Sequence, residues 1–127
     1  ELQVILQLGE LNIDIVKHKL PIEIGKLTVF HGHELNGSGG VNPARATFMK
    51  TIANVLIGHC HRSSQHSEAV YNGDVIVTTS QGCLCGMNPE YARVNKWNQG
   101  FAYVEQDVKT GEYNLLNLKI NKGKIYV

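Results

Sequence analysis

The sequence contains no run of basic residues longer than a Lys-X-Lys pair, and its formal net charge is only +1. The composition therefore does not indicate a surface that follows a nucleic-acid backbone. No apolar stretch approaches the length of a membrane span. We also recognise no signal peptide. These absences lead us to expect no membrane partner.

Cysteine is scarce: Cys60, Cys83 and Cys85 are odd in number and close together in the sequence. Such a set does not make a disulfide framework, so we predict a reducing compartment and a cytoplasmic protein. Cys83 and Cys85 also lack the two-residue spacing of the common zinc knuckle. Our interpretation is that all three are small buried hydrophobic residues. A structural zinc site made from the cysteines and a histidine is the alternative.

The chain has the size and composition of one folded domain. Its 127 residues, 43% of them apolar and 18% charged, argue against disorder and are enough for a single core. We find no internal repeat or linker and therefore predict one domain over residues 1–127. Because Glu1 opens the chain without a methionine, we expect the natural N-terminus to lie upstream.

Hydrophobic periodicity predicts an α/β fold with a mixed sheet. Two short strands are expected within 21–30, and a crossover helix at about 42–53 begins at the favourable N-cap Asn42. A buried strand follows at 55–57. Strand, helix and strand make a βαβ unit, so the strands before and after the helix should be parallel.

The remaining segments are expected to be mostly β-structure. We predict a short helix in the first ten residues, with a strand as the alternative. We also predict a short strand at 12–16 and a flexible glycine-rich loop at 36–40. After residue 68 the pattern predicts β-hairpins and a last strand. Their expected strands lie at 68–71, 74–79, 101–107, 113–120 and 124–127.

Two of the predicted strands end in histidine-containing turns. One reads His31-Gly32-His33-Glu34 and the other Gly58-His59-Cys60-His61-Arg62, and together they hold four of the six histidines. Residues two apart on an extended backbone point to the same side, and neighbouring parallel strands end at the same edge of a sheet. Imidazole is a common metal ligand, so the sequence predicts a metal site here. Arg62 is a candidate contact for an anionic substrate, with a solvated side chain as the alternative.

These two turns resemble the calcineurin-like metallophosphoesterase family. His31-Gly32-His33 and Gly58-His59-Cys60-His61 match the last two family motifs, a lone His and a Gly-His-X-His, in the same order and at a similar separation. Three further stretches resemble versions found in phages and prophages: 42–45, 82–85 and 95–98. The resemblance implies the C-terminal half of an α-β-β-α sandwich.

The earlier motifs of that family are missing from this sequence. We find no Asp-X-His and no Gly-Asn-His, and the sole Gly-Asp, Gly73-Asp74, has Val77 where the second aspartate belongs. We therefore expect a partial metallophosphoesterase domain. An expression fragment, a proteolytic product or a truncated gene would each produce it.

The resemblance also implies an activity and a ligand set. Such enzymes hydrolyse phosphomonoesters or phosphodiesters at a centre of two divalent metal ions, such as Mn, Fe, Ni or Zn. By position, His31 and His59 would bind one metal and His61 the other. His33 and Glu34 would lie in a supporting shell or, like Arg62, near the substrate.

The resemblance also leads to expectations for this chain in isolation. It lacks the carboxylate ligands, so we expect it to be inactive and to bind metal weakly or not at all. Nucleic acid is one possible substrate of the parent enzyme. We expect a homo-oligomer formed through an uncovered sheet. The alternative function is a non-catalytic interaction module with a vestigial histidine site.

Overall fold

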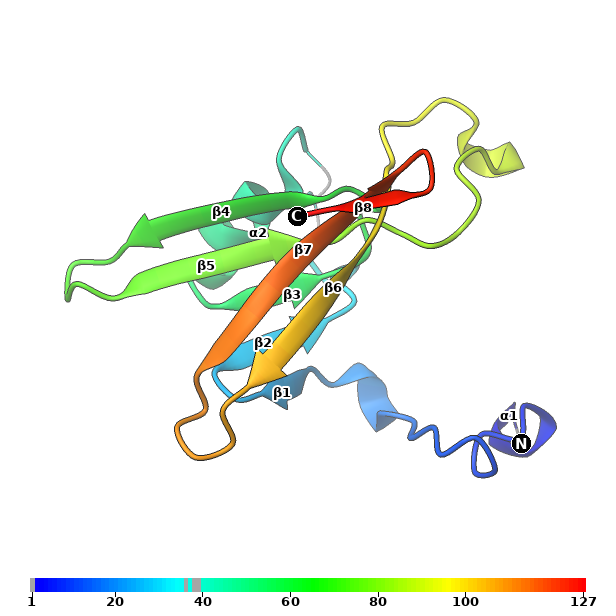
Figure 1. The fold of residues 1–127 in the computed structure, drawn as a ribbon, viewed down its shortest axis with the longest axis horizontal. Coiled ribbons are helices and arrows are strands. Elements are labelled where there is room, and N and C mark those ends of the chain that lie inside the picture. Colours follow the sequence, from blue (N-terminus) through cyan, green and yellow to red (C-terminus); the bar gives the residue numbers. More distant parts are fainter. Residues whose placement is uncertain (1, 36, 38–39) are drawn as a thin grey trace.

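The protein folds into two β-sheets and one substantial helix, as a computed structural model shows for residues 2–35, 37 and 40–127 (Figure 1). The first sheet contains β1 (Ile22–Ile24), β2 (Leu27–Phe30), β3 (Val55–Ile57), β4 (Ser64–Ala69) and β5 (Val75–Ser80). The second contains β6 (Gln99–Gln106), β7 (Tyr113–Asn121) and β8 (Lys124–Tyr126). The helical segments are α1 (Leu2–Ile5), α2 (Pro43–Thr51) and the short 3-10 helices η1 (Lys17–Lys19) and η2 (Glu90–Ala92).

The larger sheet is mixed, as predicted. Its strand order is β1-β2-β3-β5-β4, in which β2, β3 and β5 are parallel and the two edge strands are antiparallel to their neighbours. The predicted βαβ unit is confirmed, because β2 pairs in parallel with β3 and α2 connects them. The carboxyl ends of β2 and β3 therefore lie at one edge of the sheet.

The crossover helix α2 agrees closely with the predicted range of 42–53. The side-chain oxygen of Asn42 accepts a hydrogen bond from the backbone N–H of Arg45 at 3.0 Å, which satisfies one of the unpaired donors of the first turn. The helix ends where Ile52 adopts a left-handed conformation with φ of 45°. One side of α2 is buried through Pro43, Ala44, Thr47 and Phe48.

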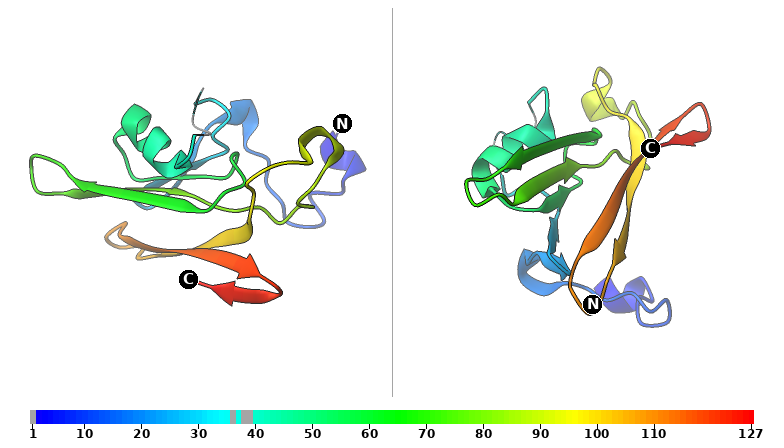
Figure 2. Two further views of the ribbon diagram at one scale, coloured as in Figure 1. Left: turned by 90° about the horizontal axis from the view of Figure 1, so that it is seen from above. Right: turned by 60° about the vertical axis from the view of Figure 1, so that its left-hand side comes forward.

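The molecule has three layers (Figure 2). The helix α2 covers one face of the larger sheet, and the β6-β7-β8 sheet lies against the opposite face. The two sheets are joined by Asn117, whose side-chain amide donates to the carbonyl oxygens of Ser64 and Ser80 at 3.3 and 3.1 Å. The apolar core under α2 consists of Leu27, Ala44, Phe48, Val55, Leu56 and Ile57.

The outer face of the second sheet carries mostly apolar side chains that are partly exposed. Because Asn117 points toward the larger sheet and side chains alternate along a strand, Leu116 and Leu118 point away from it. The strand register pairs these two leucines with Tyr103 and Phe101. The side chains on this face, which we call the outer β-face, are Phe101, Tyr103, Leu116, Leu118, Ile120 and Ile125.

Some sequence predictions need correction. Residues 12–16 do not form a strand, because this segment has no β-partner in the described structure and its side chains are exposed along an arm that leaves the body (Figure 1). The first predicted hairpin strand begins at Ser64 rather than at residue 68. The sequence of β4 is polar and lacks the apolar alternation by which a strand is recognised. In the fold, the hydroxyl of Ser64 accepts a hydrogen bond from the backbone N–H of Ala44 in α2.

The predicted loop at 36–40 lies in part outside the described residues, which omit 36, 38 and 39. The helices in the described part of the chain are all too short or too polar to cross a membrane.

Candidate metal centres

The two histidine turns are held together by backbone hydrogen bonds. The carbonyl oxygen of His31 accepts from the N–H groups of Gly58 and His59 at 3.1 and 2.8 Å. The imidazole rings of His31 and His59 consequently lie at the same edge of the sheet, with centroids 4.8 Å apart. The predicted placement of these two rings is confirmed, while metal binding stays a prediction.

A third imidazole, that of His33, joins this group. The Nδ1 atoms of His31 and His33 lie 2.9 Å apart, and the ring of His33 is 6.3 Å from that of His59 between centroids. Two nitrogens on one tetrahedral metal are expected about 3.3 Å apart, which is close to the observed separation of the Nδ1 atoms. We call His31, His33 and His59 the histidine cluster; all three are exposed and so accessible to a ligand.

Gly32 allows the first turn to lie against the second. It has a φ of 104°, and a Cβ at this position would lie 3.1 Å from the Cβ of Ile57 and 3.4 Å from that of His59. A larger residue would therefore be both strained and crowded. The glycine between the two histidines thus keeps the rings of His31 and His59 close together.

Glu34 supports His33 from the same turn. Its carboxylate accepts a hydrogen bond from the N–H of Gly32 at 3.0 Å and lies 3.3 Å from Nδ1 of His33. Its interactions with its own backbone and with Gly32, together with the nearby imidazoles, lower the pKa of Glu34 against the opposing effect of burial. These contacts place Glu34 beside His33, while a supporting role for the two residues at a metal site stays a prediction.

The electrostatics of the cluster favour a neutral His31. Burial lowers the pKa of His31 from its usual 6.5, and repulsion from His59 and His33 lowers it further, while Glu34 opposes the shift. Neutral imidazole is the form that binds metal ions. His31 is therefore a competent ligand at neutral pH.

His61 points into a different environment from His59. Residues 59 and 60 form a turn, and His61 has a φ of 53°, so the expectation of an extended His-X-His with both rings on one side is wrong. The ring of His61 packs edge-on against Trp97 with centroids 4.3 Å apart. It remains near enough to contribute to the lowered pKa of His31. The structure therefore separates the third predicted ligand from the other two without moving it far away.

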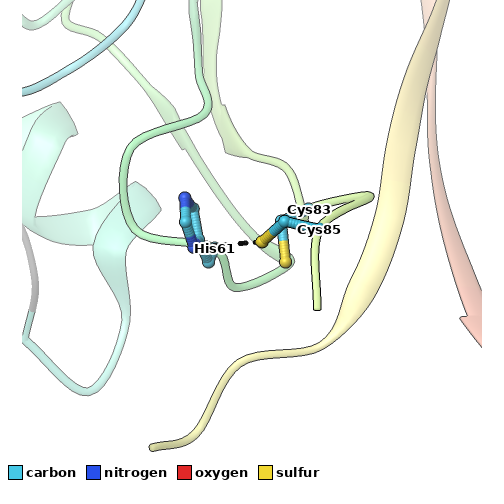
Figure 3. A group of neighbouring side chains, drawn as sticks. All are labelled: His61, Cys83 and Cys85. Carbon is cyan, nitrogen blue, oxygen red and sulfur yellow. Dashed lines mark hydrogen bonds between the residues drawn. The ribbon is translucent and has the colours of Figure 1, made fainter. Parts of the chain in front are cut away.

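His61 instead lies beside two cysteines (Figure 3). One ligand atom from each of His61, Cys83 and Cys85 lies within 4.8 Å of the other two, so this group could bind a metal ion. The Sγ of Cys85 is 3.9 Å from Nδ1 of His61. Burial, followed by the neighbouring Cys85, raises the pKa of Cys83. We call these three residues the Cys-His group.

Sequence reasoning missed this group, although it had named the kind of site. Cys83 is partly buried but Cys85 is exposed, so the expectation of three buried hydrophobic cysteines is wrong for Cys85. Cys60 is not a member of the group. The sequence does show the pair Cys83-Leu84-Cys85. Only the folded chain shows that this pair lies next to the turn that contains His61.

The backbone around the Cys-His group is anchored by Asn98. Its N–H donates to the carbonyl of His61 and its carbonyl accepts from the N–H of Cys83, both at 3.0 Å. Its side chain also bonds Ser63, accepting from the N–H at 2.7 Å and donating to the hydroxyl at 2.8 Å. Residues 84–97 form a long loop between these two anchored positions, which we call the 84–97 excursion. The hydrogen bonds of Asn98 hold both of its ends next to the histidine turn.

Arg62, the predicted substrate contact, is partly buried. Its guanidinium donates a hydrogen bond to the carbonyl of Gly40, and its own carbonyl accepts from the hydroxyl of Ser80 at 2.8 Å. These bonds tie the second histidine turn to the segment preceding α2 and to the end of β5.

Comparisons of the chain with protein-family models, with curated protein sequences and with solved structures found no match.

Proposed function

We propose that this chain contributes the histidine ligands of a metal-dependent phosphoesterase, in a larger protein with a calcineurin-like α-β-β-α sandwich. One observation carries the proposal. His31 and His59 end adjacent parallel strands of a βαβ unit, and their rings lie 4.8 Å apart between centroids. In open α/β sheets, ligands bind at the carboxyl ends of the strands.

The layer order also supports the proposed sandwich. In the described part of the chain α2 and the two sheets form three successive layers, and the outer β-face is apolar but uncovered. Under the proposal the remaining part of the sandwich packs against this face. Burying that surface would remove Tyr103 and Ile125, now 50% and 59% exposed, from water.

The histidine cluster is suited to holding a metal ion but is not a complete hydrolytic centre. His31 and His59 would act as ligands, with His33 next to them and Glu34 fixing the orientation of His33. When two divalent ions are bound, such a centre supplies a hydroxide nucleophile and neutralises charge on the phosphoryl group. Neutral imidazoles do not offset the charge of two cations, so the proposal requires carboxylates from outside this chain.

The proposal is tested by comparing the chain with its extended reading frame. With Mn²⁺ or Ni²⁺ added, the 127-residue chain should hydrolyse neither an aryl phosphate nor an aryl phosphodiester. The frame extended upstream should contain Asp-X-His, Gly-Asp-X-X-Asp and Gly-Asn-His-Asp/Glu, should turn over one of these substrates, and should lose that activity in His59→Ala. His18→Ala, in the exposed η1 segment, is the matched control and should retain it.

Two results would contradict the proposal. An extended frame without the acidic motifs would leave the histidine cluster without its partners. Turnover by the 127-residue chain that disappears in His59→Ala would show that this half is sufficient, against the requirement for outside carboxylates.

A further inference from the structure

We propose that His61, Cys83 and Cys85 form a second metal site, chemically distinct from the histidine cluster, which binds a thiophilic ion such as Zn²⁺. We further propose that the bound ion fastens the 84–97 excursion to the histidine turn. The inference does not depend on phosphoesterase activity. It also assigns His61 to the cysteines rather than to a shared centre with His59.

The spacing of the ligand atoms fits one tetrahedral ion. With Zn–S bonds of about 2.3 Å and Zn–N bonds of about 2.0 Å, ligand atoms on one ion lie about 3.5–3.8 Å apart. The observed distance between Sγ of Cys85 and Nδ1 of His61 is 3.9 Å, and no pair in the group exceeds 4.8 Å. Movements of side chains alone would therefore close the site around an ion.

The donor set selects the kind of metal. Two thiolates and one imidazole are soft or borderline ligands, which suit Zn²⁺ and Cu(I) better than Mg²⁺ or Mn²⁺. On binding, the two thiols release their protons to solvent and form two metal–sulfur bonds, so their two negative charges balance a divalent ion. The histidine cluster has no thiolate, and the two sites should therefore prefer different metals.

The backbone places these ligands before any metal binds. Asn98 hydrogen-bonds to the backbone of both His61 and Cys83, and Cys85 follows Cys83 after a single residue. Gly82 passes so close to Asn98 that an added Cβ would lie 2.6 Å from its carbonyl oxygen. A site whose ligands are already held in place loses less entropy on binding.

The position of His61 also favours the cysteines over the histidine cluster. Trp97, at the end of the excursion, packs against its ring at 4.3 Å between centroids, while Cys85 lies beside its Nδ1. The side of the group formed by Cys85 is exposed, so an ion can enter and a water molecule can complete its coordination. The metal would thus join the first part of the excursion, at Cys85, to the turn that Trp97 already contacts.

Cobalt substitution in the full chain tests the site. Co²⁺ bound by thiolates gives intense ultraviolet charge-transfer bands, whereas Co²⁺ on imidazoles alone does not. We expect these bands in the unmodified chain and their loss in Cys85→Ser, a substitution at an exposed position that should not disturb folding. Cys60→Ser is the matched thiol control and should keep the bands, as should His59→Ala.

Zinc binding and mobility provide a second readout. Competition with a chromophoric chelator should show at least tenfold weaker Zn²⁺ binding in Cys85→Ser and in His61→Ala. X-ray absorption of the zinc-loaded chain should report two sulfur neighbours. Zn²⁺ should slow hydrogen exchange within residues 84–97 in the unmodified chain but not in Cys85→Ser.

The possible outcomes separate this inference from the proposed phosphoesterase. Bands that survive Cys85→Ser, or that disappear in Cys60→Ser, would overturn the Cys-His site. Bands that disappear in His59→Ala would indicate that His59 and His61 share one metal centre, and this result would also overturn the Cys-His site. A chain that binds Zn²⁺ through sulfur, in an extended frame without phosphoesterase activity, would leave the inference standing and contradict only the proposed function.

Discussion

A single backbone conformation separates His59 from His61. The sequence suggested an extended His-X-His, but residues 59 and 60 turn and His61 takes a φ of 53°. The ring of His59 therefore faces His31, and that of His61 faces Trp97 and Cys85. Positive φ is uncommon outside glycine and was not readable from the residue type, so the sequence could predict the two turns but not the direction of each ring.

The lowered pKa of His31 gives a prediction at the scale of one residue. Without metal, its imidazole should titrate below 6.5 when followed by NMR, and His59→Ala should raise this pKa because one source of repulsion is removed. His66→Ala, which alters a histidine paired with Glu68 on β4, should leave the pKa of His31 unchanged. An unchanged value in His59→Ala would show that the two rings do not interact.

The same shift sets the sign of a stability change. Between the folded pKa of His31 and 6.5, the unfolded chain binds more protons at this position than the folded chain does. Stability contributed by His31 is therefore present above pH 6.5 and is lost as the pH falls through that interval. Denaturant unfolding of the metal-free chain should show this decline, and it should be weaker in His31→Gln.

Gly82 provides a second prediction at residue scale. In Gly82→Ala the new Cβ would lie 2.6 Å from the carbonyl oxygen of Asn98 and 2.8 Å from the N–H nitrogen of Gly100, both backbone atoms. We expect destabilisation of about 1–3 kcal/mol in chemical denaturation, the usual cost of overpacking. Gly86→Ala is the matched control, since a Cβ there meets no atom within 4 Å. Equal stability of the two variants would contradict the close approach.

At the scale of elements, the sequence predicted best where local signals and packing agree. The helix α2 combines an N-cap at Asn42, Pro43 at its start and a buried apolar side, and its range was predicted to within two residues at each end. Residues 12–16 have an alternating pattern but pair with no strand in the described part of the chain, because β-structure requires a partner that local sequence does not specify. The start of the polar strand β4 was predicted too late in the chain for a related reason. Its pairing with β5 and its contact with α2 determine where it begins, and the local sequence shows neither.

The cap of α2 is testable by substitution. Asn42→Ala should lower the free energy of unfolding by about 1 kcal/mol, because the N–H of Arg45 loses its hydrogen-bond acceptor. Asn42→Asp keeps an acceptor oxygen and places a negative charge at the positive end of the helix, so it should be no less stable than the unmodified chain. Urea denaturation followed by circular dichroism would measure both. A loss of equal size in Asn42→Asp would argue against the cap.

At the scale of the whole molecule, the outer β-face leads us to expect self-association. Uncovered apolar sheet faces favour contact with another protein surface, and a second copy of the chain supplies one. Sedimentation at crystallisation concentrations should detect an oligomer that weakens in Tyr103→Lys. Tyr71→Lys, in the exposed β4–β5 turn, should not change the association. A monodisperse monomer of the unmodified chain would refute this expectation.

The parallel pairing of β2, β3 and β5 has a consequence for the order of folding. The hairpins β4–β5 and β6–β7 join segments adjacent in the chain, whereas β2 meets β3 only after the chain has passed through α2. Contacts between distant segments form late because closing a long loop costs entropy first. His31 and His59 would then meet only near the end of folding. A partly folded chain would present the hairpins while its two histidine turns were still apart, so metal capture by the histidine cluster would mark a completed fold.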